Sequence, residues 1–206
     1  DPRLEMKDEY GFFAYSPKTK SRDEAFSQKT LLFQTLKAAK KESPDIDMII
    51  LPECAMEINE IKDFEETISQ YDVSTYVAGV RNSHKENDQR HFHDNMVLFR
   101  VGDKTKTLEN ETIRFGEVKP EEIQHKHHRW RLNRSQIETY NLGHILSPNK
   151  DWWEAIKIRR RKVTFVNIGE ELTVCPLICE DLARQDPIAD LIRTVGPSLV
   201  ITILMD

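Results

Sequence analysis

Residues 174–183 have the sequence VCPLICEDLA, an apolar run that ends in a cysteine followed by two acids and then by residues that favour a helix. This pattern predicts a buried strand that turns directly into a helix at Cys179. A strand-to-helix turn lifts one side chain clear of the sheet, and the first N–H groups of the helix point toward whatever that side chain attacks. We therefore expect a nucleophilic thiol at Cys179, with the backbone N–H of Glu180 as an oxyanion donor.

A nucleophilic thiol needs a proton acceptor and a positive charge nearby, because the thiolate is the reactive form. The candidate acceptor is Glu53, which closely follows the apolar residues 49–51. Polar residues at strand ends of this kind form the sites of open α/β folds. The candidate cation is Lys126, within the sequence QHKHHRW of residues 124–130. Glu53, Lys126 and Cys179 are therefore the candidate catalytic residues.

The order of these three residues resembles the Glu-Lys-Cys triad of the nitrilase superfamily of carbon–nitrogen hydrolases. The resemblance runs from about Phe26 to the end of the chain. Two shorter stretches also occur in family order, AGV at residues 78–80 and HDNMVL at residues 93–98. Glu138, twelve positions after Lys126, is similar to the second glutamate that many members carry after the lysine.

The resemblance implies an α/β fold, the nitrilase-like four-layer α-β-β-α sandwich, here missing its C-terminal elements. It also implies an enzyme in which Glu53 takes the Cys179 proton while the sulfur attacks the substrate and forms a thioester. Lys126 and the N–H of Glu180 would stabilise the oxyanion, and Glu138 would position the hydrolytic water. No metal or organic cofactor is implied.

The partners implied by the resemblance are a small amide-like or nitrile-like substrate and further copies of the chain. These copies would form a homodimer or higher oligomer by docking through residues 183–195. The chain departs from the family pattern in two places. Residues 131–134 are polar where members usually have a proline-rich stretch, and residues 149–162 are longer and more basic than a minimal member needs. Loops 82–90 and 117–128 would form pocket walls. Nitrile, amide, carbamoyl and glutamine substrates all stay open.

Composition limits the class of protein. The chain has 206 residues, which suits one domain with a substantial core and is too short for two. Its formal net charge of −5 argues against a general polyanion-binding surface. No segment approaches the roughly 20 apolar residues of a membrane span, so we expect a cytoplasmic protein with no membrane partner. Three cysteines cannot all pair, which favours a reducing compartment and a free Cys179.

The chain starts at Asp1 and ends on the apolar residues 198–206, so we expect a single incomplete domain, 1–206, taken from a longer polypeptide. This expectation carries an alternative function, a nitrilase-like binding or assembly module of a larger multidomain protein. The sequence is similar to nitrilase-like domains joined to bacterial reverse transcriptases in antiviral defence. Nucleic acid would then be a partner only through other domains.

Three further groups of residues have competing interpretations. The histidines at 91, 93, 125, 127 and 128 could hold a metal, but no recognised zinc spacing follows, which favours a solvated basic loop. The basic residues 159–162 could grip phosphate or protect an exposed strand edge, and we favour the edge. Cys54, beside Glu53, is more simply explained as core packing.

Apolar periodicity predicts an alternation of helices and strands typical of α/β proteins. We expect a turn at residues 102–104 and a short helix or extended segment at 152–158. The remaining expectations are helices at 23–41, 58–71 and 190–195, strands at 48–51, 74–80, 92–101, 113–117 and 198–206, and a hairpin of 163–168 with 171–177.

Overall fold

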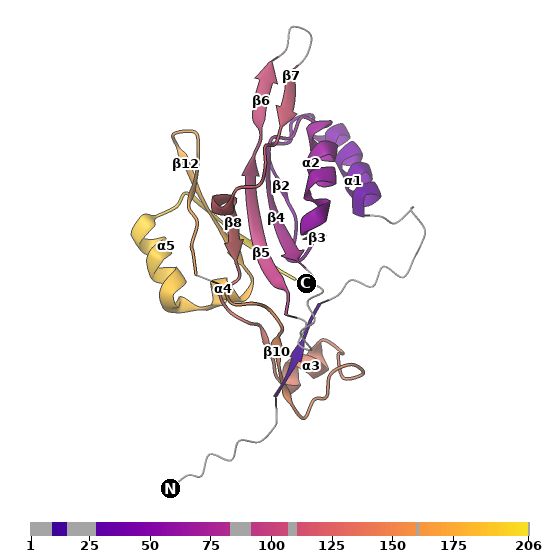
Figure 1. Ribbon diagram of the computed structural model, residues 1–206, viewed down its shortest axis with the longest axis vertical. Coiled ribbons are helices and arrows are strands. Elements are labelled where there is room, and N and C mark those ends of the chain that lie inside the picture. Colours follow the sequence, from indigo (N-terminus) through magenta and orange to yellow (C-terminus); the bar gives the residue numbers. More distant parts are fainter. Residues whose placement is uncertain (1–9, 16–27, 83–91, 107–110, 160, 206) are drawn as a thin grey trace.

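The computed structural model describes residues 10–15, 28–82, 92–106, 111–159 and 161–205, and shows a mixed α/β chain (Figure 1). Four sheets and several short helices make up these ranges. The predicted helix start at 23–27 and the predicted loop of residues 83–90 lie outside the described residues, as does His91.

The central sheet has the strand order β2-β4-β5-β8, with β3 paired to β4. β2 and β3 run parallel to β4, whereas β5 is antiparallel to both β4 and β8. β4 and β5 are buried along nearly their whole length, because both faces of the sheet are covered. The strands are β2 (Ile49–Ile50), β3 (Met56–Glu57), β4 (Thr75–Asn82), β5 (Asp94–Val101) and β8 (Ile123–His125).

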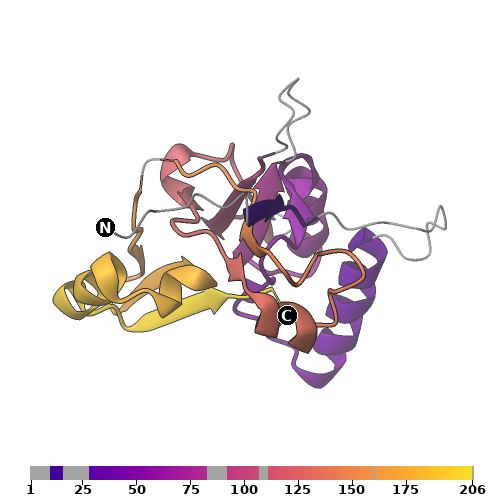
Figure 2. The same cartoon turned by 90° about the horizontal axis from the view of Figure 1, so that it is seen from below.

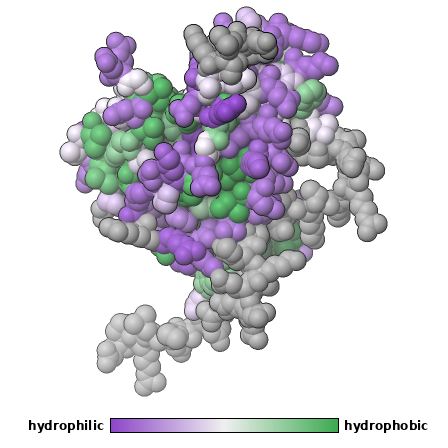
Figure 3. All heavy atoms as spheres, turned by 45° about the horizontal axis from the view of Figure 1, so that its top comes forward, coloured by the Kyte–Doolittle hydropathy of each residue, from purple (hydrophilic) through white to green (hydrophobic). Residues whose placement is uncertain are grey.

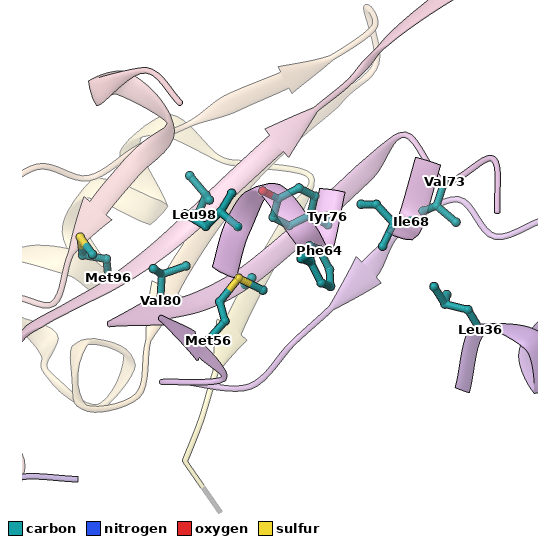
Figure 4. Close-up of a cluster of buried hydrophobic side chains, with 11 residues drawn as sticks. Leu36, Met56, Phe64, Ile68, Val73, Tyr76, Val80, Met96 and Leu98 are labelled. Carbon is teal, nitrogen blue, oxygen red and sulfur yellow. The ribbon is translucent and has the colours of Figure 1, made fainter. Parts of the chain in front are cut away.

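One face of this sheet packs against α1 (Gln28–Glu42) and α2 (Ile61–Ser69), which η2 (Ile58–Glu60) precedes. Figure 4 shows side chains of α2 and the central sheet converging, among them Phe64, Tyr76 and Leu98. The rings of Phe64 and Tyr76 meet edge to face at 5.0 Å between centroids. The helices predicted at 23–41 and 58–71 are confirmed in their described parts, with α1 ending one residue later and α2 two residues earlier than predicted.

The other face packs against a second sheet of order β11-β12-β13, in which β12 is antiparallel to β11 and parallel to β13. Val77 and Val97 of the first sheet contact Val174 and Ile203 of the second. The outer face of β12 is covered by Ile188 and its neighbours. The elements are β11 (Val166–Ile168), β12 (Leu172–Ile178), α4 (Glu180–Ala183), η4 (Gln185–Ala189), α5 (Asp190–Val195) and β13 (Leu199–Ile203).

The elements therefore stack as helices, sheet, sheet and helices. Figures 1 and 2 place α1 and α5 on opposite sides of the two sheets. The predicted hairpin of β11 and β12 and the predicted strand and helix around residues 190–203 are confirmed. Gly196, with φ of +65°, ends α5 in the left-handed conformation that favours glycine.

A third, smaller sheet of order β1-β10-β9 lies beside α3 at the lower end of Figure 1. Its core contains Leu132, Ile137 and Leu146, with Trp130 and Trp152 packed around them. The sequence alone leaves open whether residues 152–158 form a short helix or an extended segment, and residues 152–154 are extended, as part of β10. The elements are β1 (Tyr10–Phe13), β9 (Arg131–Leu132), α3 (Arg134–Thr139) and β10 (Asp151–Glu154).

The predicted turn at residues 102–104 is wrong, because Asp103 and Lys104 belong to β6 (Asp103–Lys106), which pairs with β7 (Glu111–Arg114). The chain continues from β5 through Gly102 into β6 without reversing, and the N–H of Gly102 donates to Ser74 O at 2.7 Å. A Cβ at Gly102 would lie 2.8 Å from a methyl carbon of Ile113. Glycine therefore marks a close approach here instead of a reversal. η3 (Pro120–Glu122) follows before β8.

Exposed apolar side chains gather on the left side of Figure 3, the side on which Figure 1 places α5. Those on α5 and β13 are Leu191, Val195, Leu199 and Val200. Of the helices that the structure describes, none has both the length and the apolar content that crossing a bilayer requires.

Gly79 of β4 allows the backbone that follows β2 to lie directly against the sheet. A Cβ at Gly79 would lie 2.5 Å from Glu53 Cα and 2.6 Å from Cys54 N, and closer still to Pro52 O. Real Cβ atoms do not approach backbone this closely, so only glycine fits. The small-residue stretch at 78–80 thus sets the position of Glu53.

We expect Gly79→Ala to destabilise the protein by about 1–3 kcal/mol, because the added methyl must push the segment of Glu53 off the sheet. Urea denaturation measures this. Gly143→Ala is the matched control, since a Cβ there meets no atom within 4 Å. Equal stabilities of the two variants would contradict the close approach at Gly79.

Candidate active site

Three strand ends from the two stacked sheets bring together the residues predicted as catalytic. Glu53 closely follows β2, and Lys126 and Cys179 directly follow β8 and β12. Main-chain hydrogen bonds tie two of these ends to the end of β13: Cys179 N donates to Ile203 O at 2.9 Å, and Glu53 N donates to Leu204 O at 3.1 Å. The adjacent acceptors on β13 hold Glu53 and Cys179 next to each other.

Cys179 occupies a sharp strand-to-helix turn, as predicted. Its φ of +42° and ψ of −107° lie in a region that a residue with a side chain rarely adopts, and α4 begins at the next residue. Such strain persists only where the surrounding structure enforces it, and it concentrates at functional sites. Glu180 is the first residue of α4, so its N–H has no acceptor within the helix.

Lys126 lies between two buried glutamates. Its Nζ donates to Glu53 Oε1 at 2.8 Å and to Glu154 Oε2 at 2.6 Å, and the amide of Asn95 bridges the same two carboxylates at 2.7 and 2.8 Å. The exposed fractions of Lys126, Glu53 and Glu154 are 2 %, 4 % and 6 %. Burial alone would lower the pKa of Lys126, but the charges and hydrogen bonds of Glu154 and Glu53 outweigh it and raise that pKa. The lysine is therefore a permanent buried cation with one N–H left to donate.

Glu53 acts on the thiol of Cys179 through both its charge and a side-chain hydrogen bond. Burial and then Glu53 raise the pKa of Cys179 to about 11, although Lys126 opposes them. The resting group at neutral pH is consequently the thiol, and attack requires its proton to leave in the same step. Glu53 Oε2 is buried and has no hydrogen-bond partner among the described residues, which leaves it open for that proton.

The two other cysteines have less reactive surroundings. Cys54 and Cys175 are buried, whereas Cys179 is half-buried. Burial raises the pKa of Cys54 to about 12, with Glu53 adding to the effect, and burial raises the pKa of Cys175 to about 11. Cys179 is thus the thiol that a reagent reaches first.

Glu138 is not in this site. It lies on the surface in α3, paired with Arg134 at 2.9 Å. The glutamate beside Lys126 is Glu154, at the buried end of β10, where Trp130 N also donates to it at 3.1 Å. The error came from counting positions after the lysine, whereas the sheet of β1, β9 and β10 brings in a residue 28 positions away.

Sequence reasoning also missed Asp181, which is fully buried two residues after Cys179. Its carboxylate accepts hydrogen bonds from His127 N at 3.0 Å and His128 N at 3.0 Å, and lies 3.0 Å from His128 Nδ1. Through these hydrogen bonds the carboxylate joins His127 and His128, which follow Lys126, to the start of the helix that follows Cys179. An acidic residue directly inside a helix after a candidate nucleophile was the available signal.

The basic residues 159–162 do not form a strand edge, because no strand includes the described residues among them. Arg159 pairs with the buried Asp94 at 2.9 and 3.1 Å, and Lys162 Nζ donates to Pro120 O at 2.9 Å. Arg160 lies outside the described residues. Within the ranges that the structure covers, no three His, Cys, Asp or Glu side chains group as a metal site requires.

No family model and no curated protein matches the chain. Among solved structures, it is similar to the glutamine-dependent NAD+ synthetase from Acinetobacter baumannii in complex with ADP, with a TM-score of 0.47 and 13% sequence identity. The similarity covers 87% of this chain and 29% of that chain, so the chain spans less than a third of the synthetase. A similarity this weak carries no argument about function.

We expect Lys126→Met to lower the free energy of unfolding by about 3–5 kcal/mol, because it leaves two buried carboxylates without a counter-charge. Lys150→Met, at an exposed position, is the control and should change little. Urea denaturation measures both.

The triple variant Glu53→Gln, Lys126→Met, Glu154→Gln removes all three charges and should unfold at higher urea than Lys126→Met alone. A Lys126→Met protein as stable as the wild type would contradict the buried network.

The pKa of Cys179 predicts that its alkylation by iodoacetamide rises about tenfold per pH unit from pH 7, with a midpoint near pH 11. Glu53→Gln should move the midpoint downward, because it removes the charge and hydrogen bond that raise the pKa. Glu138→Gln is the matched control and should leave it unchanged. Peptide mass mapping after short pulses measures the rates.

The pulses must be short because the folded state loses stability at high pH, and an unfolded chain would expose all its cysteines to the reagent. A folded thiol with a raised pKa contributes stability below the ordinary value of 9.0, and that contribution is lost as the pH rises toward about 11. An alkylation midpoint near the ordinary value, or no shift in Glu53→Gln, would contradict the interaction between Glu53 and Cys179.

Proposed function

We propose that this protein is a carbon–nitrogen hydrolase that cleaves a small amide-like or nitrile-like substrate through a thioester on Cys179. One observation carries the proposal: a thiol on a strained strand-to-helix turn adjoins a buried glutamate and a buried lysine. These are the acceptor, the cation and the nucleophile that thiol catalysis at a carbonyl carbon needs.

In the first half of the proposed reaction, Cys179 Sγ attacks the carbonyl carbon while its proton moves to Glu53 Oε2. The negative charge that develops on the substrate oxygen is stabilised by the remaining N–H of Lys126 and by the backbone N–H of Glu180. Glu53 then gives its proton to the leaving nitrogen as the carbon–nitrogen bond breaks. Ammonia or an amine departs, and the acyl group stays on the sulfur.

In the second half, Glu53 takes a proton from water as the water oxygen attacks the thioester. The carbon–sulfur bond breaks, the acid product leaves, and the proton returns from Glu53 to Cys179. Glu154 and Asn95 keep Lys126 and Glu53 in place throughout. Glu138 has no role in this scheme, because it lies on the surface.

The stack of helices, sheet, sheet and helices supports assigning the nitrilase-like sandwich as the fold of this chain. We also infer that the protein is cytoplasmic and forms a homodimer or higher oligomer. Exposed Leu191 and Val195 on α5, which lie within the predicted interface at 183–195, support self-association, and exposed Leu199 and Val200 on β13 extend the apolar surface beyond it.

The test is release of ammonia from a panel of primary amides and nitriles, together with intact-mass detection of an acyl adduct. We expect Cys179→Ala to lower the rate at least about a thousandfold and to abolish the adduct. Cys54→Ala is the control, because that buried thiol takes no part in the scheme. Release by Cys179→Ala at the wild-type rate would overturn the mechanism. Inert wild-type protein across the panel, with no adduct, would favour the assembly-module alternative.

A further inference from the structure

A surface groove of about 430 Å³ lies next to the proposed catalytic residues and takes no part in the scheme above. The described residues that line it are three aromatic, one aliphatic and four basic or imidazole side chains: Tyr10, Phe12, Trp153, Ile158, His127, His128, Arg129 and Arg161. Its size falls in the range of small-ligand sites.

Two of the aromatic side chains in the groove, Tyr10 and Phe12, are exposed to a ligand. The exposed fractions of Tyr10 and Phe12 are 63 % and 39 %, although both belong to strand β1. Trp153 already has the guanidinium of Arg131 over its ring, 5.8 Å from the centroid. Flat rings of this kind accept planar heteroaromatic groups by stacking, largely regardless of which ring is offered.

The groove is also basic. Arg161 is exposed, and no aspartate or glutamate is among the described residues that line it. Arg129 is held in place, because its Nη2 donates to Ile156 O at 2.8 Å and its guanidinium covers the ring of Phe92 at 5.6 Å. The carboxylate that faces His128 is Asp181, which is fully buried behind it.

Two lining residues carry a buried polar atom that no described residue satisfies, His127 Nδ1 and Arg129 Nε. The pKa of His127 is lowered, first by burial and also by the charges of His128 and Arg161, although Asp181 and a backbone hydrogen bond oppose this. Arg129 Nε is a buried donor without an acceptor among the described residues, and an anionic group that entered the groove would meet the positive charges of Arg129 and Arg161.

We propose that this groove binds a nucleotide, with its base against the aromatic wall and its phosphate against the arginines. A planar ring that carries an anionic phosphate matches both walls at once, and arginine is suited to phosphate by the geometry of its guanidinium. The source of the nucleotide is either a free mononucleotide or one unit of a single strand. The proposal does not rest on the proposed hydrolase activity.

The experiment is calorimetric titration of the whole chain, carrying Cys179→Ala so that no turnover occurs, with adenosine monophosphate. Adenosine, which lacks the phosphate, and inorganic phosphate, which lacks the ring, are titrated in parallel. We expect the nucleotide to bind at least tenfold more tightly than either. We expect added salt to weaken its binding.

Arg161→Ala and Tyr10→Ala should each weaken nucleotide binding at least fivefold, and both positions are exposed enough to leave the fold intact. Arg134→Ala and Tyr140→Ala are the matched controls, since they remove the same side chains outside the groove. A short single-stranded oligonucleotide distinguishes the sources: tighter binding than the mononucleotide points to a strand, and equal or weaker binding points to a free nucleotide.

Three results would overturn the proposal: no binding of the nucleotide at millimolar concentration, equal binding of inorganic phosphate, or equal losses in the groove and control variants. Each is independent of the hydrolase test, because the Cys179→Ala background has no nucleophile.

Discussion

The buried cation of Lys126 is the constraint on which the rest of the site depends. An ammonium taken out of water costs several kcal/mol unless opposite charges and hydrogen bonds surround it. The chain meets this requirement with Glu53, from the turn that follows β2 of the central sheet, and Glu154, from β10 of the small sheet. The central sheet and the small sheet of β10 must therefore assemble together. The sheet of β11, β12 and β13 is joined to them by the hydrogen bonds that Cys179 N and Glu53 N donate to Ile203 O and Leu204 O.

Buried charge alone does not make a site, and a second network in the same chain demonstrates this. Arg100 is 2 % exposed and pairs with Glu65 at 3.2 Å and with Glu122 at 2.9 Å. Burial raises the pKa of Glu65 as well. The hydroxyl that adjoins these groups, that of Tyr76, is fully buried and donates to Glu65 Oε1 at 2.7 Å, so the network is best explained as a structural tie between β5, α2 and η3. The site of Lys126 differs from this network in two respects. Cys179, which carries a thiol, has a strained backbone conformation, and Glu53 Oε2 has no hydrogen-bond partner among the described residues.

The fold and most of the site could be predicted from local signals. Glu53 and Cys179 follow apolar strands, and polar residues at such strand ends form the sites of open α/β folds. Lys126 follows β8, whose sequence Ile-Gln-His carries no apolar signal, so it was identified from its place in the resemblance instead. Glu154 could not be found in this way, because its contact with Lys126 depends on a long-range parallel pairing of β10 with β1. The expected turn after β5 failed for a related reason: Gly102 serves a close contact with Ile113, which local turn statistics cannot distinguish from a reversal. The prediction of a strand edge at 159–162 failed because Asp94, far away in the sequence, forms an ion pair with Arg159 that holds this segment out of any sheet.

The groove and the charged network share backbone, which has a consequence for both proposals. His127 and His128 line the groove and directly follow Lys126, while Asp181 holds their N–H groups from a position two residues beyond Cys179. Trp153 lines the groove and directly precedes Glu154. A ligand that orders the groove walls therefore acts on residues adjacent to the lysine, to its second glutamate and to the nucleophile's helix. Because coupling between two equilibria is reciprocal, any effect of a groove ligand on the proton equilibrium of Cys179 must be matched by an equal effect of that proton on the affinity for the ligand.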